Sequence, residues 1–288
     1  MTHVLMFPGQ GSQRVGMGGA ALFDRFPDLV AEADEVLGHS LRELCLSDPH
    51  QRLHHTAYTQ PALYAVNALS YRALRADGMP APDAAIGHSL GEYNALCAAG
   101  VFGFTDGLRL VAARARAMSR VTDGAMAAVI GMDEAVIRLL LRRAGLEAVE
   151  VANLNTADQT VVAGPAAKLD TAAALLKDSG ATAVRRLKVS GPFHTHHMRP
   201  AAHEFAPHLA RTSLGEPAFP VYANRTARPY APGHIAELLT EQIDHPVRWH
   251  ETVRRLLDAD PDTRFQEVGA GPVLTRMVRA IRTERTPS

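Results

Sequence analysis

The chain has 288 residues, of which 47% are hydrophobic, and its 30 basic side chains balance 30 acidic ones. This length is enough for one large domain or two modest ones with a buried core. A formal net charge of zero gives no general attraction to nucleic acid or to a membrane surface. The composition therefore favours a globular protein that captures any anionic ligand at a local site.

The two cysteines, Cys45 and Cys97, lie in apolar surroundings without C-x-x-C spacing, which argues against a disulfide framework and against a zinc site. The N-terminal "MTHVLMFPGQ" lacks the pattern of a signal peptide, and no stretch approaches the roughly 18 consecutive apolar residues of a membrane span. We therefore expect a cytoplasmic monomer that binds neither nucleic acid nor membrane.

The first part of the chain alternates strand and helix patterns. "HVLMFPG" is an apolar run stopped by Pro-Gly, which is typical of a buried strand that leads into a glycine-bearing loop. Further along, an apolar strand pattern covers residues 83–87. The spacing of apolar residues predicts helices over residues 19–38, 40–46, 58–78, 90–99 and 105–121.

From residue 124 the order of elements changes. Strand and helix patterns follow one another as βαββαβ within residues 124–193, the order of a ferredoxin-like unit; its last strand is predicted over 183–191. We interpret it as a subdomain inserted into a larger α/β layer made of residues 1–123 and 194–288. The final residues, 283–288, are expected to be frayed.

Ser89 stands between two glycines in "GHSLGEY" and satisfies the pattern G-x-S-x-G. This pattern alone also fits a plain tight turn. A strand pattern precedes Ser89 and a helix pattern follows it, as a nucleophile elbow requires, and the helix N-terminus would face a developing oxyanion. The context therefore favours Ser89 as a nucleophile.

A serine nucleophile requires a base, and spacing cannot choose among 14 histidines. The segment "GPFHTHHM" lies where the inserted subdomain returns to the main layer, so His194, His196 or His197 is expected to face a cleft between the two parts. The same cluster is compatible with a metal site. However, H-x-H-H supplies only two ligands and no partner is nearby in sequence, so we predict no metal.

Five motifs in order resemble one family, the malonyl-CoA:acyl-carrier-protein transacylases, which includes the free-standing acyltransferases of polyketide synthases. They are "FPGQGSQ" (7–13), "GHSLGEY" (87–93), "RARAM" (114–118), "GPFH" (191–194) and "QIDHPVRW" (242–249). The resemblance covers the chain almost from end to end. It implies an α/β-hydrolase-like large domain with a ferredoxin-like insertion.

The resemblance assigns the catalytic roles residue by residue. It implies that Ser89 accepts the acyl group and that His194 is its general base, because His194 follows "S-G-P-F". No acid completes a triad in this family, and the main-chain carbonyl of Gln242 is expected to orient the imidazole. The main-chain amides of Gln10 and Leu90 are expected to bind the oxyanion.

The resemblance also implies the substrate contacts. Arg114 would hold the free carboxylate of a malonyl group through two charge-assisted hydrogen bonds, although its spacing alone would suit a solvated helix charge. Phe193, just before the histidine, is expected to exclude the extra methyl group of methylmalonyl. His88, Asn153 and Asn155 are assigned to the acyl or CoA site.

These assignments predict a ping-pong transfer of malonyl from malonyl-CoA to the phosphopantetheine thiol of an acyl carrier protein, with no bound cofactor. Two settings stay open, fatty-acid synthesis and polyketide synthesis, with a preference for the second. Two alternatives use the same residues differently. One is an acyl hydrolase at the Ser89 and His194 site, and the other is a non-catalytic module that binds carrier protein.

Overall fold

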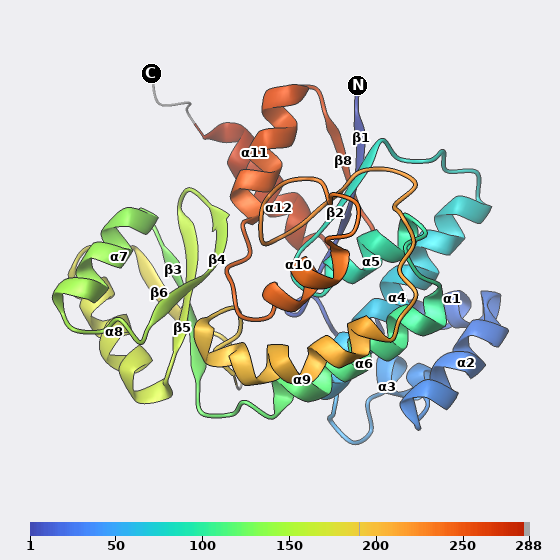
Figure 1. Ribbon diagram of the computed structural model, residues 1–288, viewed down its shortest axis with the longest axis horizontal. Helices are drawn as coiled ribbons and strands as arrows, with labels where there is room; N and C mark the ends of the chain where they lie inside the picture. Colours follow the sequence, from blue (N-terminus) through green and yellow to red (C-terminus); the bar gives the residue numbers. More distant parts are fainter. Residues whose placement is uncertain (190, 285–288) are drawn as a thin grey trace.

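The computed structural model describes residues 1–189 and 191–284. Strands of the described residues form two separate sheets, each covered by helices (Figure 1). The predicted mixed α/β fold is therefore confirmed at this level. The predicted end of the strand over 183–191 includes Ser190, and the tail predicted to fray includes residues 285–288. Both of these lie outside the described residues.

The larger sheet is parallel and has the strand order β7-β2-β1-β8. Its strands are β1 (His3–Phe7), β2 (Ala84–Gly87), β7 (Val221–Tyr222) and β8 (Arg264–Glu267). Residues of β1 are buried on both faces: Leu5 and Phe7 join one apolar cluster, whereas Val4 and Met6 join another. Helices cover both faces of this sheet, as parallel sheets require.

We call the larger sheet, together with the helices that precede residue 120 and those that follow residue 195, the larger unit. Helices of this unit pack in one or the other of the two apolar clusters. One face of the sheet packs against α5 (Gly91–Ala98), and α4 (Thr56–Ala76) and α6 (Phe104–Ser119) belong to the same apolar cluster on that side. The opposite face packs against α11 (Trp249–Ala259) and α12 (Val273–Thr283). The other helices are α1 (Gly19–Arg25), α2 (Pro27–Leu37), α3 (Leu41–Leu46), α9 (Arg199–Ala210), α10 (Ile235–Glu241) and the short 3-10 helix η1 (His196–Met198).

The single helix predicted over residues 19–38 is two helices in the structure. The break falls at Phe26, whose φ of −133° and ψ of 57° are not helical, and Pro27 occupies the start of α2. Proline lacks an amide hydrogen and disfavours the helical conformation of the residue before it. The hydrophobic spacing continues across the break, and for this reason the pattern alone did not reveal it.

The smaller sheet is antiparallel with the order β4-β5-β3-β6. Its elements are β3 (Ala125–Ile130), α7 (Glu134–Arg143), β4 (Glu150–Thr156), β5 (Gln159–Gly164), α8 (Ala166–Asp178) and β6 (Ala183–Arg186). These elements together are called the smaller unit. Ala127 and Val129 face a cluster shared with α7 and α8, whereas Met126 and Ala128 join the large cluster of the larger unit. This sheet therefore lies between its own helices and the rest of the molecule.

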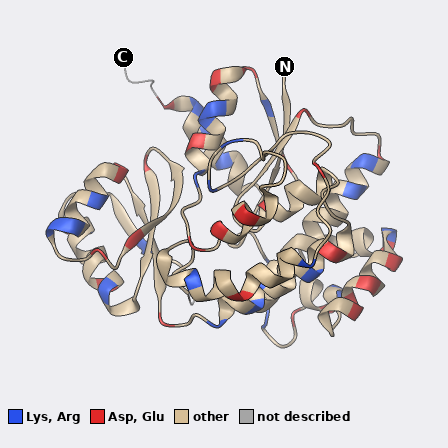
Figure 2. Cartoon of the chain, viewed as in Figure 1, with Lys and Arg blue, Asp and Glu red and all other residues tan. Residues whose placement is uncertain are grey.

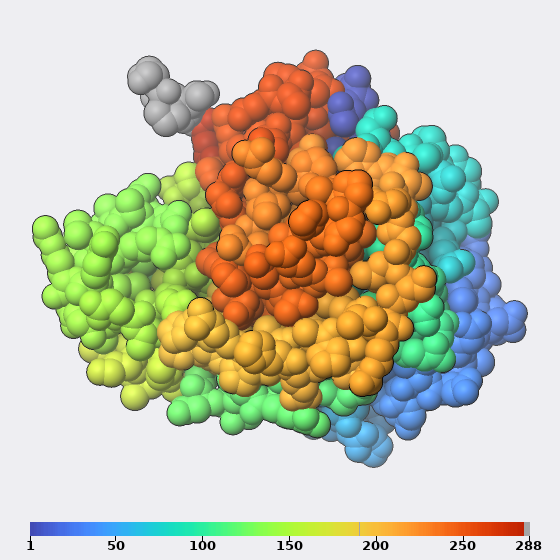
Figure 3. Space-filling view, viewed as in Figure 1, coloured from blue at the N-terminus to red at the C-terminus, as the bar shows by residue number. Residues whose placement is uncertain are grey.

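Main-chain hydrogen bonds join the two units at β4. The Val247 amide donates to the Ala152 carbonyl at 2.9 Å, and the Leu154 amide donates to the Val247 carbonyl at 2.9 Å. The segment after α10 thus adds a short parallel bridge to the edge of the smaller sheet. On the face drawn in Figure 3, the segment from α9 to α10 (yellow-orange to orange) lies between the smaller unit and the N-terminal helices.

Acidic and basic residues are both distributed over the outer helices of the two units (Figure 2). Within the described part of the chain, no helix combines the length and the apolar character needed to cross a bilayer.

Candidate active site

Ser89 lies in a sharp elbow between β2 and α5. Its φ of +52° is in the left-handed region, which is a strained conformation for a serine. The two neighbouring glycines allow the close packing: a Cβ atom on Gly87 would lie 2.0 Å from the main chain of Gly91, and one on Gly91 would lie 1.9 Å from the Phe7 carbonyl oxygen. This is the geometry of a nucleophile elbow, with the hydroxyl presented at the end of a strand.

His194 contacts the serine directly. The distance from Ser89 Oγ to His194 Nε2 is 2.7 Å, and the distance from His194 Nδ1 to the Gln242 carbonyl oxygen is also 2.7 Å. A carbonyl only accepts, so Nδ1 carries the hydrogen and Nε2 is left to accept the serine proton. The main chain of His194 is also held in the left-handed region, with a φ of +64°.

The environment keeps the imidazole of His194 unprotonated. Burial, followed by the positive charge of Arg114, lowers the pKa of His194 to about 3. At neutral pH Nε2 is therefore free to accept a proton. The cost is a weaker base, and the Gln242 carbonyl offsets part of this by favouring the protonated ring.

Arg114 is buried, with 1% of its surface exposed, and its guanidinium lies beside the Ser89 hydroxyl. Nη2 donates to Ser89 Oγ at 3.1 Å and to Gln242 Oε1 at 2.9 Å, while Nη1 donates to Gln60 Oε1. The interpretation of Arg114 as a solvated helix charge is therefore wrong. Its exposed neighbour Arg116, two positions further along α6, has that role instead.

Glu92 is a buried acid that was not among the site residues predicted from the sequence. Its carboxylate accepts hydrogen bonds from the Tyr230 hydroxyl, the Gln242 side-chain amide and the Asn224 main-chain amide. Burial raises the pKa of Glu92 to about 7, although these donors and Arg114 act in the opposite direction. The Gln242 amide thus links the two buried charges, with its oxygen toward Arg114 and its nitrogen toward Glu92.

Asn224 holds the elbow from the other side. Its Oδ1 accepts from the Ser89 main-chain amide at 2.7 Å, and its Nδ2 donates to the Gly87 carbonyl at 2.6 Å. No motif in the sequence pointed to Asn224, Glu92 or Gln60 as site residues. The available signal was a set of polar residues inside otherwise apolar strand and helix patterns.

The two residues predicted to bind the oxyanion lie close to Ser89. Gln10 and Leu90 both line the cleft beside Ser89. Among the described residues, no hydrogen bond from either main-chain amide is found. The loop that carries Gln10 packs tightly on the elbow, because a Cβ atom on Gly9 would lie 2.3 Å from the His88 carbonyl oxygen.

A cleft of about 390 Å³ surrounds these groups. Phe193, His88, Asn153 and Asn155 also line it, and the distance from His88 Nε2 to Asn155 Oδ1 is 2.9 Å. Burial lowers the pKa of His88. Of the predicted site residues, Gln242 alone is not part of the lining; it lies behind His194 and contacts Arg114 and Glu92.

The cleft separates the three histidines that the sequence left as candidates for the base. His194 lines it, whereas His196 and His197 lie outside the lining and close to Glu150 on β4.

Attack on an acyl group is the chemistry that suits this geometry. The Ser89 hydroxyl contacts the unprotonated imidazole of His194, and Gln10 and Leu90, whose main-chain amides make no hydrogen bond among the described residues, lie beside the hydroxyl. The comparisons with known proteins agree. A family model described as acyl transferase domain matches residues 4–286. The chain therefore belongs to the acyl transferase domain family.

Curated relatives extend this finding. The chain is 46% identical to "Polyketide biosynthesis malonyl CoA-acyl carrier protein transacylase BaeC" of Bacillus velezensis, over 98% of each chain. It is 49% identical to "Polyketide biosynthesis protein ThaF" of Burkholderia thailandensis, over 97% of this chain but only 24% of the relative. A crystal structure of a malonyl CoA-acyl carrier protein transacylase from Burkholderia pseudomallei matches with a TM-score of 0.96, 49% identity and full coverage of both chains.

Proposed function

We propose that this chain transfers a malonyl group from malonyl-CoA to the phosphopantetheine thiol of an acyl carrier protein, through an acyl-enzyme on Ser89. The observation that carries the proposal is that Ser89 Oγ contacts both His194 Nε2, at 2.7 Å, and Arg114 Nη2, at 3.1 Å. A base and a carboxylate-binding group thus meet at one hydroxyl. The names of the relatives support the same reaction.

In the first half-reaction, Ser89 Oγ attacks the thioester carbonyl of malonyl-CoA while His194 Nε2 takes its proton. The oxyanion is bound by the amides of Gln10 and Leu90. The C–S bond then breaks, and the departing CoA sulfur receives the proton from His194. The products are the malonyl ester of Ser89 and free CoA.

The second half-reaction runs the same chemistry in reverse. His194 Nε2 takes the proton of the carrier-protein thiol, the sulfur attacks the ester carbonyl, and the C–O bond to Ser89 breaks. The serine oxygen recovers the proton from His194. No bound cofactor is required, because the thioester already supplies an activated acyl group. We retain the expectation of a cytoplasmic monomer.

Arg114 selects the acyl group. Its guanidinium would pair with the malonyl carboxylate, which a plain acyl group lacks. This pairing would also offset the positive charge that lowers the pKa of His194, so the base becomes stronger when the correct substrate is bound. Phe193 would then limit the volume beside the α-carbon and favour malonyl over methylmalonyl.

We place the reaction in polyketide synthesis, because both curated relatives reported above carry polyketide biosynthesis in their names.

We also propose that residues 1–123 and 194–288 form an α/β-hydrolase-like large domain and that 124–193 form a ferredoxin-like subdomain. The antiparallel order β4-β5-β3-β6 supports the second assignment, since it follows from a βαββαβ connection.

The test is to incubate the protein with malonyl-CoA alone and then with holo carrier proteins, and to follow both by intact mass. We expect a malonyl adduct on the wild type, its absence in Ser89→Ala, and its transfer to a carrier protein. Release of free malonate that outpaces transfer would favour an acyl hydrolase. No adduct on the wild type would favour a non-catalytic binding module.

A further inference from the structure

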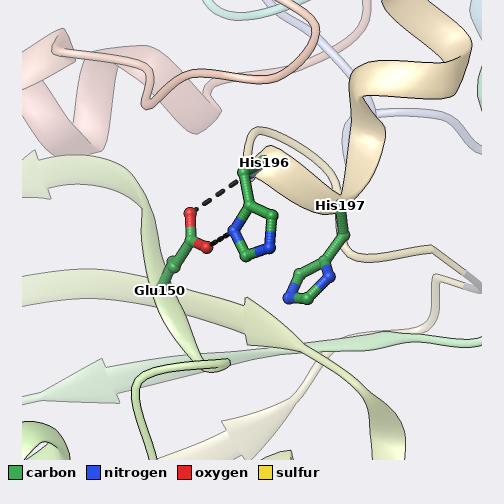
Figure 4. Close-up of side chains that lie close together, drawn as sticks. All are labelled: Glu150, His196 and His197. Carbon is green, nitrogen blue, oxygen red and sulfur yellow. Dashed lines mark hydrogen bonds and ion pairs between the residues drawn. The ribbon is translucent and has the colours of Figure 1, made fainter.

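Three potential metal ligands meet outside the cleft, at the junction of the two units. Glu150 lies at the start of β4, and His196 and His197 form the first two residues of η1. One ligand atom from each of the three side chains lies within 4.8 Å of the other two. Figure 4 shows the Glu150 carboxylate facing the ring and the main chain of His196, with His197 beside them.

Glu150 is the third ligand that the sequence pattern H-x-H-H lacked. It is 46 residues away from His196 in the chain, and the fold brings it to the histidines. Its Oε2 accepts the His196 main-chain amide at 3.2 Å, and its Oε1 contacts His196 Nδ1. The absence of a third partner was the sequence-based reason to predict no metal, and the tertiary structure removes that reason.

A local hydrogen bond prepares the imidazole of His197 for coordination. His197 Nε2 lies 2.8 Å from the Ala148 carbonyl oxygen, so Nε2 donates its hydrogen and Nδ1 keeps a free lone pair. Metal-binding histidines usually donate their other ring N–H in this way. The rings of His196 and His197 lie 3.9 Å apart, centroid to centroid, so two imidazole nitrogen donors lie near the Glu150 carboxylate.

We propose that Glu150, His196 and His197 form a binding site for a divalent transition-metal ion, with Zn²⁺ as the ion whose ligand preference matches. Two imidazole nitrogens and one carboxylate oxygen suit Zn²⁺, and water completes the tetrahedron. His196 is about half exposed, with 51% of its side chain accessible, so an ion reaches the site from solvent. Arg199 is nearby, with its Nε 3.8 Å from Asp244 Oδ2. Its positive charge repels a bound cation, so the site binds an ion more weakly than a closed structural site does.

A bound ion joins the smaller sheet to the larger unit. Glu150 belongs to β4, which also carries Asn153 and Asn155 of the cleft, whereas His196 follows the catalytic His194 by two residues. Coordination therefore fixes the distance between the edge of the smaller sheet and the turn that positions the base. The ion takes no part in acyl transfer and acts as a reversible cross-link between the units.

The experiment uses the full chain, freed of any polyhistidine tag and stripped with a chelator. Co²⁺ titration followed by visible absorption, and Zn²⁺ titration by calorimetry, are performed on the wild type, Glu150→Gln and His197→Gln. His203→Gln is the matched control, because His203 is an exposed histidine on α9 outside the cluster. The melting temperature with and without Zn²⁺ is a second readout that does not depend on catalysis.

We expect one saturable ion per chain for the wild type and the control, and binding at least about tenfold weaker in both cluster variants. Zn²⁺ should raise the melting temperature of the wild type and of His203→Gln but not of Glu150→Gln. Circular dichroism of the apo variants checks that they are folded. The proposal is overturned if the wild type binds no ion saturably, or if either cluster variant binds as tightly as the wild type.

Discussion

Arg114 is a buried cation, and within the described part of the chain its guanidinium donates to neutral partners, the side chains of Gln60, Ser89 and Gln242. A buried charge costs free energy unless an opposite charge compensates it. Glu92, reached through the Gln242 amide, supplies part of that compensation. A substrate carboxylate would supply the rest at close range, and selectivity for a dicarboxylic acyl group would follow.

Replacing Arg114 with alanine tests this account. Two charge-assisted hydrogen bonds of roughly 1.5–3 kcal/mol each correspond to a loss of at least about a hundredfold in malonyl transfer. Transfer of acetyl, which has no carboxylate, should gain relative to malonyl. Steady-state kinetics with both CoA esters measures the ratio, and Arg116→Ala on the exposed side of α6 is the control. An unchanged ratio in Arg114→Ala would contradict the assignment.

Phe193 is 5% exposed and lines the cleft immediately before the base. Replacing it with serine removes the ring that would meet a methyl group on the α-carbon. Discrimination of one methyl group is worth about 1–3 kcal/mol, so the methylmalonyl to malonyl ratio should rise by about 10- to 200-fold. Competition between the two CoA esters, analysed by mass, measures this ratio. A ratio equal to that of the wild type would remove Phe193 from the selectivity pocket.

Glu92 should make the stability of the protein depend on pH with a definite sign. Burial raises its pKa from 4.5 to about 7 in the folded state, so between these values the native protein binds more protons than the unfolded chain. Rising pH therefore favours the unfolded state in this window. The free energy of unfolding of the wild type, minus that of Glu92→Gln, should fall from pH 4.5 to about 7 and stay level above it. Denaturant titrations at several pH values measure this difference in the free energy of unfolding. A difference that does not change with pH would contradict the raised pKa of Glu92.

At the scale of elements, the contact between β1, β2 and α5 fixes the position of Ser89. Gly91 opens α5, and a Cβ atom there would lie 1.9 Å from the carbonyl oxygen of Phe7 in β1. A main-chain oxygen cannot move aside as the end of a flexible side chain can, so β1 and α5 would have to move apart.

Gly91→Ala should therefore lower the free energy of unfolding by about 3 kcal/mol or more, at the upper end of overpacking costs. Gly103→Ala is the matched control, since a Cβ atom there meets nothing within 4 Å and its φ of −71° suits any residue. Thermal melts of both variants provide the comparison. Similar melting temperatures for the two variants would contradict the close packing at the elbow.

The order of elements was predictable from the sequence because it depends on local periodicity. Strand and helix patterns located β1, β2, the smaller sheet and the helices around the elbow. They did not locate the break at Pro27, where apolar spacing continues through a change of direction. They also predicted a strand over residues 183–191, whereas β6 ends at Arg186.

The partners of the site were less predictable than its reactive groups. Ser89 and His194 stand in recognisable motifs, but Ser89 and Asn224 are separated by 135 residues and Arg114 and Gln60 by 54. A hydrogen bond between such positions depends on how helices and sheets pack. Periodicity carries no information about that packing.

At the scale of the whole molecule, the two units share one apolar core. Met126 and Val161 of the smaller sheet belong to the same cluster as Phe7 and Leu90, and the bridge at Val247 adds main-chain hydrogen bonds between the units. Unfolding of either unit would expose the core of the other. We therefore expect the units to unfold together.

Trp249, the only tryptophan of the chain, makes this testable. It is buried in the cluster behind the larger sheet, so its fluorescence reports the larger unit, whereas far-ultraviolet circular dichroism reports both. The two denaturation curves should coincide, as two-state unfolding requires. A separate dichroism transition without a fluorescence change would mean that the smaller unit unfolds alone.

The main-chain acceptor on His194 also bears on how the protein tolerates mutation. A carbonyl oxygen is present whatever side chain occupies position 242, so no point substitution there deletes the acceptor itself. A Ser-His-Asp enzyme, by contrast, loses its orienting group when one codon changes. Here the acceptor is a property of the path of the chain at the end of α10. Sequence drift at position 242 would thus disturb the contacts to Arg114 and Glu92 before it altered the tautomer of the base.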